Sequence, residues 1–152
     1  MRVLVVTVGG SPAPIISAYK EFEPDFTYFV CSKGNPPSGT EGMVDGEGDP
    51  CGDRRTKVCP HCGGIVPLGD PKGKCLVEQL QIPKDAYKKV ILNDPDDLQE
   101  VYDAMLGIHK EVSERFRPDR KAICYTGGTK TMTAGAVLLG IRYPDWELAI
   151  ER

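Results

Sequence analysis

Two kinds of hydrophobic segment alternate along the chain. One is a short apolar run rich in β-branched residues, such as RVLVVTV at 2–8, which is typical of a strand buried on both faces. The other is a longer segment with apolar residues on one helical face. Strands are expected at 2–8, 25–31, 88–94, 121–126 and 146–151, and helices at 15–22, 76–82, 94–116 and 129–143. This alternation predicts a mainly parallel sheet with right-handed crossovers, so residues 1–152 are expected to form an α/β, Rossmann-like doubly wound domain.

Helix 94–116 shows the clearest helical pattern. Acidic residues occupy its first turn, where they favour the helix dipole, and its apolar residues form one stripe. The stripe consists of Leu98, Val101, Tyr102, Met105, Val112 and Phe116. His109 in the same helix is expected to be a partly exposed surface residue. Helix 15–22 follows GGSPAP, in which Ser11 is the expected N-cap and Pro12 is tolerated in the first turn.

Composition and charge restrict the classes of function. The chain has 152 residues, enough for one sizeable core, and a net charge of −3, which argues against general binding to nucleic acids. No apolar run has the length of a membrane span, and the apolar N-terminus is too short and valine-rich for a secretory signal. The sequence therefore predicts a cytoplasmic protein in which any bound anion occupies a local pocket.

Residues 33–75 depart from this pattern, because they are rich in Gly, Pro, Asp and Cys with little apolar periodicity, and we interpret them as an insertion. The cysteines clustered here are Cys51, Cys59, Cys62 and Cys75. In a cytoplasmic chain such clustering favours a metal over disulfides. We therefore predict a structural zinc ribbon or knuckle with these four thiolates as ligands, which leaves no open position for water. A redox-active Cys-x-x-Cys is the alternative, and His61 is an alternative ligand.

Two of the expected strands end in Gly-Gly, within TVGGSPAP at 7–14 and YTGGTKT at 125–131. In an open parallel sheet, ligands bind beyond the carboxyl ends of the strands. Glycine lets backbone N–H groups approach a ligand closely, and a helix N-terminus adds unpaired N–H donors and a partial positive charge. Hydroxyl groups and one full positive charge are added by Ser11, Thr129, Thr131 and Lys130. These features predict an anion site, and phosphate is the best match.

Neither turn matches the two common nucleotide-binding motifs. GGTKT lacks the four-residue spacing that separates the first glycine from Gly-Lys in a P-loop. GGSPAP lacks the Gly-x-Gly-x-x-Gly pattern of dinucleotide-binding proteins. ATP hydrolysis and hydride transfer therefore lose support as functions of this chain.

VTVGGSPAPI, NDPDDL and YTGGTKTM resemble the CARF domain, the CRISPR-associated Rossmann fold of type III CRISPR ancillary proteins in antiviral defence. The resemblance covers residues 1–32 and 76–152. It implies a homodimer in which two copies of the glycine turns build one pocket for cyclic oligoadenylate. Cyclic tetra-adenylate is the expected ligand and cyclic hexa-adenylate the second choice. Such a sensor regulates an effector, which would lie outside this chain.

The resemblance also implies which residues contact the ligand. They are Gly9, Gly10, Ser11, Asn93, Asp94, Gly127, Gly128, Thr129 and Lys130. Met132 is expected to pack behind the late turn. Some CARF domains cleave their ligand without a metal, so one alternative is a ring nuclease that uses Ser11, Thr129 and Lys130. A CARF-type transcription regulator is another, although nothing here resembles a helix-turn-helix and no direct DNA binding is expected.

Overall fold

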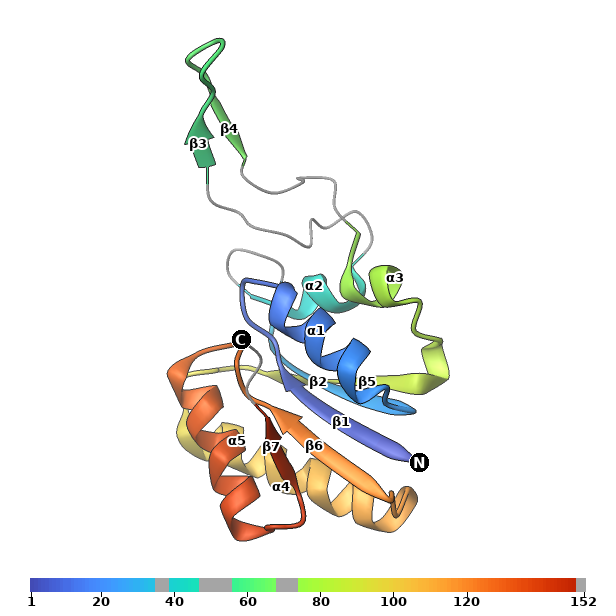
Figure 1. Ribbon diagram of the computed structural model, residues 1–152. Helices are drawn as coiled ribbons and strands as arrows, with labels where there is room; N and C mark the ends of the chain where they lie inside the picture. Colours follow the sequence, from blue (N-terminus) through green and yellow to red (C-terminus); the bar gives the residue numbers. More distant parts are fainter. Residues whose placement is uncertain (35–38, 47–55, 68–73, 150–152) are drawn as a thin grey trace.

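Outside residues 33–75, strands and helices alternate along the chain as the hydrophobic pattern predicts, and within that segment the structure adds a short helix and a two-stranded hairpin (Figure 1). The computed structural model describes residues 1–34, 39–46, 56–67 and 74–149. The elements are β1 (Arg2–Thr7), α1 (Ala13–Phe22), β2 (Phe26–Ser32), α2 (Glu41–Asp45), β3 (Thr56–Val58), β4 (Ile65–Pro67), α3 (Leu76–Leu80), a 3₁₀ turn η1 (Lys84–Ala86), β5 (Tyr87–Leu92), α4 (Leu98–Arg115), β6 (Arg120–Cys124), α5 (Lys130–Arg142) and β7 (Glu147–Ala149). None of the described helices combines the length and the apolar character that crossing a membrane requires.

Five parallel strands form the main sheet in the order β5–β2–β1–β6–β7. The buried β1 lies at the centre, paired with β2 on one side and β6 on the other. The chain runs outward from β1 to β2 and β5, then returns past β1 to form β6 and β7 (Figure 1). The strand order therefore reverses between β1 and β6, which is where open α/β sheets bind ligands. The predicted α/β, Rossmann-like doubly wound fold is confirmed.

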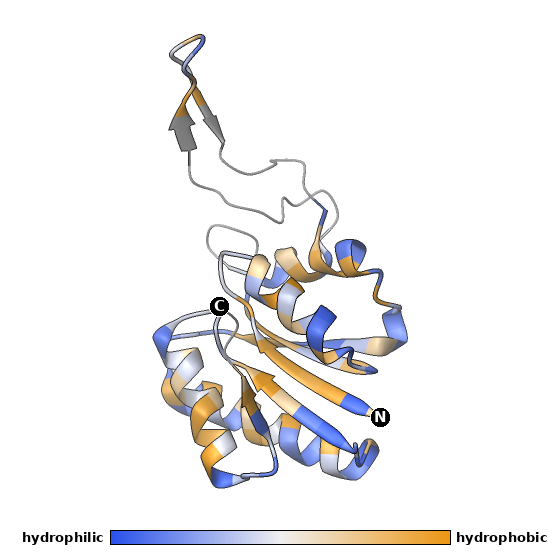
Figure 2. Ribbon diagram, viewed as in Figure 1, coloured by the Kyte–Doolittle hydropathy of each residue, from blue (hydrophilic) through white to orange (hydrophobic). Residues whose placement is uncertain are grey.

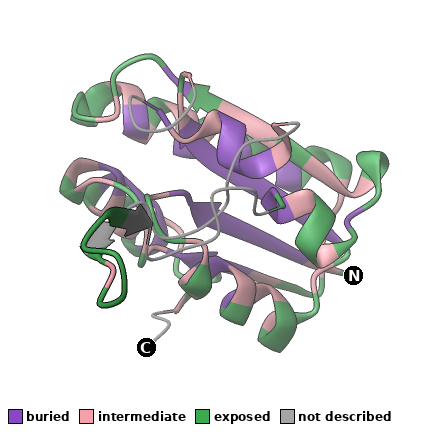
Figure 3. Ribbon diagram, turned by 90° about the horizontal axis from the view of Figure 1, so that it is seen from above, coloured by how far each residue is buried: buried purple, intermediate pink, exposed green. Residues whose placement is uncertain are grey.

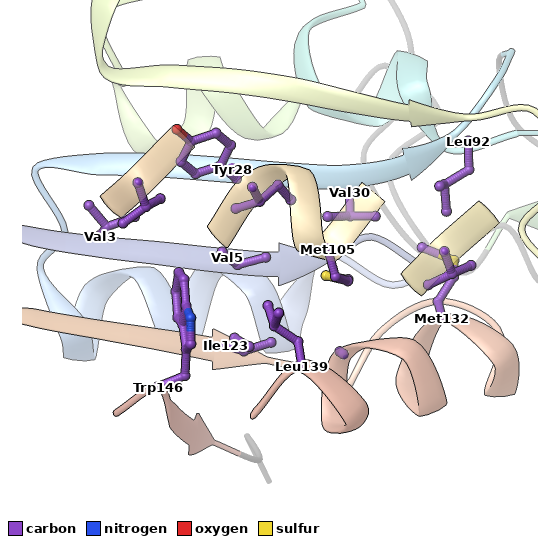
Figure 4. Packing of buried hydrophobic residues seen from close by; sticks show 14 of the residues in the cluster. Val3, Val5, Tyr28, Val30, Leu92, Met105, Ile123, Met132, Leu139 and Trp146 are labelled. Atoms are coloured by element: carbon purple, nitrogen blue, oxygen red, sulfur yellow. The ribbon is translucent and has the colours of Figure 1, made fainter. Parts of the chain in front are cut away.

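Helices cover both faces of the sheet, each over its own core. On one face α4 and α5 cover a cluster that includes Val5, Met105 and Ile123 (Figure 4). On the other face α1, α2 and α3 cover a cluster that includes Leu4 and Phe29. Successive residues of a strand point to opposite faces, so neighbours such as Leu4 and Val5 belong to different cores. Figure 2 shows the hydrophobic central strands, and Figure 3 shows them buried between helices with exposed outer surfaces.

Helix α1 begins without the side-chain cap expected from Ser11. Its N-cap is Pro12, and no side chain accepts a hydrogen bond there. Ser11 lies one residue before the cap and is exposed. Pro14 occupies the second helical position and has no N–H that a capping oxygen would bind. The prediction that Ser11 caps this helix was therefore wrong.

Helix α2 was not expected, because it lies in the segment rich in Gly and Pro. Its Met43 and Val44 are nevertheless buried and belong to the core beneath α1. Ion pairs of 3.5 and 2.9 Å join Lys89 of β5 to the carboxylates at the two ends of α2. The helix is thus held to the sheet by contacts with residues that are distant in the sequence.

Gly135→Ala and Gly107→Ala are expected to change stability in opposite directions. A Cβ at Gly135 of α5 would lie 2.4 Å from Cγ1 of Val101 on α4, so alanine should lower the free energy of unfolding by about 1–3 kcal/mol. A Cβ at Gly107 of α4 meets no atom within 4 Å, so alanine should raise it by about 0.5–1 kcal/mol through helix propensity. Urea denaturation measures both changes. Equal effects at the two positions would contradict the close contact between α4 and α5.

Candidate functional site

The glycine turns that follow β1 and β6 lie against each other at the carboxyl edge of the sheet. The hydroxyl of Thr7, the last residue of β1, donates a 2.6 Å hydrogen bond to the carbonyl oxygen of Gly127. A Cβ at Gly9 would lie 2.4 Å from the backbone nitrogen of Gly128. A Cβ at Gly127 would lie 2.5 Å from the carbonyl oxygen of Thr7. The two turns therefore touch backbone to backbone, and the expectation that they share one edge of the sheet is confirmed.

Thr129 caps α5 and joins it to the loop after β5. Its Oγ1 accepts the N–H of Met132 at 3.1 Å and donates to the carbonyl oxygen of Pro95 at 2.8 Å. The only hydroxyl hydrogen is therefore used within the chain. In this geometry the Thr129 side chain holds the late turn in place and has no hydrogen left to donate to an anion. Its role as a ligand contact or in ring cleavage stays a prediction.

The first turn of α5 supplies backbone donors and a cation. The N–H groups of Lys130 and Thr131 have no hydrogen-bond partner within the described ranges, as is usual for the first residues of a helix. The side chain of Lys130 is exposed at the positive end of the helix dipole. An anion at this end of α5 would meet two N–H donors and an ammonium group, which is the arrangement that binds phosphate in other proteins.

Met132 packs beneath the late turn, as expected. It is buried, and its Sδ accepts the N–H of Thr129 at 3.5 Å. Gly128 has a φ of +88°, and a Cβ there would lie 2.9 Å from the Met132 side chain. Figure 4 shows Met132 at the end of the core that lies between the sheet and α5. This methionine therefore supports the turn from below, and only glycine suits position 128 above it.

The turn after β1 leads into a helix start that lacks two backbone N–H groups. Gly10 and Ser11 are exposed, and a Cβ at Gly10 meets no atom within 4 Å. Pro12 and Pro14 at the start of α1 carry no N–H group. At this edge α5 thus contributes a cation, while the first turn contributes the exposed Gly10 and the hydroxyl of Ser11.

The loop between β5 and α4 is held by a carboxylate that the sequence reasoning did not single out. Glu100 accepts the N–H groups of Asn93 and Asp94 at 2.7 and 2.9 Å. Asp97 caps α4, and its spacing from Glu100 matches a capping box, a signal by which Glu100 could have been found. The bond from Thr129 to Pro95 joins this loop to the late turn. The side chains of Asn93 and Asp94 are exposed near this junction.

Two of the four predicted zinc ligands lie together, since Cys59 and Cys62 share the turn of the β3–β4 hairpin. Cys75 is buried at the start of α3, and Cys51 lies outside the described residues. Backbone N–H groups of Cys62 and His61 hold the pKa of the Cys59 thiol below its ordinary value. No three potential metal ligands gather within the described part of the chain. The zinc site therefore stays a prediction.

No family model and no curated protein matches this chain. Among solved structures it is similar to Enterococcus italicus Csm6 bound to cyclic hexa-2'-fluoro-hexa-dAMP, with a TM-score of 0.62 and 14% identity over 99% of this chain and 33% of that chain. It is also similar to a type III CRISPR defence DNA nuclease activated by cyclic oligoadenylate, with a TM-score of 0.55 and 16% identity over 90% of this chain and 16% of that chain. The chain thus spans a third or less of each, and it shares the α/β fold found within these two CRISPR proteins.

Proposed function

We propose that this chain is a CARF-type sensor, which binds cyclic oligoadenylate at its two glycine turns and regulates an effector outside the chain. The observation that carries this proposal is the contact between the turns at the point where the strand order reverses. Two proteins with the same fold support it, because one was solved with a cyclic hexanucleotide and the other is activated by cyclic oligoadenylate.

The chemistry of the residues suggests which part of the ligand each of them would contact. The N–H donors and ammonium group at the start of α5 suit phosphate oxygens. Asn93 and Asp94 present side-chain oxygens, which accept hydrogen bonds from an adenine amino group or a ribose hydroxyl. The carboxylate of Asp94 would repel a phosphate. In this arrangement Gly9, Gly10 and Ser11 border the ribose–phosphate ring from the side of β1.

The pocket is proposed to form between two copies of the chain. Gly10, Ser11 and Lys130 are exposed, so one copy presents an open surface to the ring. On α5, Leu138 and Ile141 are 42% and 66% exposed, and helical spacing places them on the side that carries Lys130. A two-fold contact through this apolar stripe would bring both copies of Lys130 toward the axis. Such symmetry fits a ring with an even number of identical units, with cyclic tetra-adenylate first and cyclic hexa-adenylate second.

Lys130→Ala is expected to weaken the binding of cyclic oligoadenylate by roughly 1.5–3 kcal/mol, because the phosphate site loses a well-placed cation. Calorimetric titration of the dimer with cyclic tetra- and hexa-adenylate measures this change. Lys110→Ala is the matched control, since Lys110 is an exposed lysine on α4 outside the site. The affinity of the Lys110→Ala variant for cyclic oligoadenylate should equal that of the parent protein.

The outcomes separate the parts of this proposal. Equal affinity in Lys130→Ala and the parent would remove Lys130 from the site. A monomeric mass at the concentrations of the titration, or no heat with either ring, would overturn the dimeric sensor. Chromatography of the titrated mixture also tests cleavage, because linear oligoadenylate would add ring-nuclease activity to the sensor role.

A further inference from the structure

The β3–β4 hairpin has little apolar packing to hold it. Each strand has three residues, and the two pair in antiparallel fashion. Val58 and Ile65 lie opposite each other next to the turn, yet they are 68% and 77% exposed. Figure 1 shows the hairpin standing away from the sheet. An isolated hairpin of this size is marginally stable in water, so a cross-link would be needed to keep it ordered.

The turn of this hairpin arranges its backbone around two sulfur atoms. The N–H of Cys59 donates to the carbonyl oxygen of Gly64 at 2.8 Å, and the N–H of Gly63 donates back to the carbonyl oxygen of Cys59 at 2.9 Å. Gly63 has a φ of +72°, which reverses the chain within the turn. The N–H of Gly64 then donates to Sγ of Cys62 at 3.4 Å. Cys62 is exposed and Cys59 partly exposed, so both thiols are accessible to an ion.

We propose that Cys59 and Cys62 form the preorganised half of a tetrahedral zinc site, which we name the zinc knuckle (residues 59–64). Two thiolates at this spacing bind one tetrahedral ion from a single turn. The N–H group that points to sulfur delocalises thiolate charge and fixes its orientation, as outer hydrogen bonds do at metal sites. Each thiol gives its proton to solvent when the metal binds. Soft thiolate ligands in tetrahedral geometry favour zinc or iron, and the elemental analysis below separates the two.

The knuckle supplies two of the four ligands that a closed zinc site requires. The described part of the chain gathers no third potential ligand with Cys59 and Cys62, and Cys75 is buried at the start of α3, so the cysteine variants below identify the other two ligands. A site of four thiolates has no position for water or substrate, so its role is to order the hairpin. Zinc binding would then supply the folding energy that the exposed Val58 and Ile65 do not. This inference is independent of the proposed ligand site.

The test is the metal content of the purified chain. We expect one zinc ion per chain by native mass spectrometry and elemental analysis, with zinc–sulfur distances of about 2.3 Å by X-ray absorption. Cys59→Ser and Cys62→Ser should each reduce zinc content at least about tenfold. The zinc content of Cys51→Ser and Cys75→Ser is measured in the same way, and a similar reduction identifies a remaining ligand. Cys124→Ala is the matched control, because Cys124 is a buried core cysteine on β6 and its removal should leave zinc in place.

Protease resistance gives a second readout that does not depend on the variants. Removal of zinc by a chelator should expose the hairpin to cleavage, while the α/β sheet keeps its circular dichroism signal. A parent protein without zinc, a Cys59–Cys62 disulfide under reducing conditions, or full zinc content in Cys59→Ser would each overturn the proposal. One zinc ion per two chains would overturn the single-chain site.

Discussion

Under the proposed sensor function, Gly9→Ala is expected to abolish the binding of cyclic oligoadenylate, and it should lower the free energy of unfolding by about 1–3 kcal/mol. The added methyl would lie 2.4 Å from the backbone nitrogen of Gly128 and 3.4 Å from the carbonyl carbon of Gly127. Because these are main-chain atoms, no side-chain rotation relieves the clash, and the two turns must separate. Their separation displaces the start of α5, so Lys130 and the neighbouring N–H groups leave their positions.

Gly10→Ala is the matched control for stability. A Cβ there meets no atom within 4 Å, so the free energy of unfolding should stay within about 0.5 kcal/mol of the parent value. A lower affinity at unchanged stability in this variant would report contact with the ligand itself. Urea denaturation and calorimetric titration measure the two quantities. Parent-like stability and affinity in Gly9→Ala would show that the turns do not depend on their mutual contact.

The order of the elements was predictable because most elements carry a local signal. The strand β1 is a continuous apolar run, and the buried residues of α4 recur at helical spacing, so neither depends on distant residues to be recognised. The rule that parallel strands end at one edge then brings Gly9 and Gly127 together without knowledge of any contact. Fold class and the shared edge of the two turns therefore follow from local pattern and topology.

Helix α2 was not predicted because its stability comes from distant residues. EGMVD is short, contains glycine and follows a Pro-rich loop, so its helix propensity is low. Burial of Met43 and Val44 against the sheet outweighs this propensity. The contact between Lys89 and Glu41 joins residues 48 positions apart. No local pattern encodes such contacts.

The same limit applies to individual side chains. Thr129 was expected to offer a hydroxyl donor, but its hydrogen goes to Pro95, 34 positions away. His109 is partly exposed as expected, yet its Nδ1 accepts a hydrogen bond from Trp146, 37 positions away. Both bonds exist because α4 packs beside α5 and near the start of β7, and this packing determines the hydrogen-bond partners that spacing alone does not reveal.

Trp146→Ala is expected to lower the free energy of unfolding by about 3–5 kcal/mol, the largest stability loss proposed for this chain. Trp146 is buried before β7, in the core shown in Figure 4. Its Nε1–H donates to Nδ1 of His109 at 3.0 Å, and the ammonium of Lys121 lies 4.9 Å from its ring centre. Removal of the indole therefore leaves a cavity between α4, β6 and β7. Denaturation by urea measures the loss, and a cost below about 1 kcal/mol would contradict this packing.

The bond to Trp146 also makes stability depend on pH, because Nδ1 of His109 accepts only while the imidazole is neutral. Burial, and then the charge of Lys121, lower the pKa of His109 from its ordinary value, while Asp145 opposes the shift. The unfolded chain takes up this proton near pH 6.5, whereas the folded chain takes it up only at lower pH. The free energy of unfolding should therefore fall as the pH drops below about 6.5, until the folded His109 is itself protonated.

His109→Asn separates this effect from the titration of carboxylates. The Oδ1 of asparagine can take the place of Nδ1 as acceptor for the indole N–H, but it does not titrate. Denaturation at about pH 7 and about pH 5.5 should then show a smaller loss of stability in this variant than in the parent. Trp146→Phe should also reduce the loss, because protonation of His109 no longer breaks a hydrogen bond. An equal loss in the parent and His109→Asn would assign the pH dependence to other groups, since asparagine leaves no proton to bind at this position.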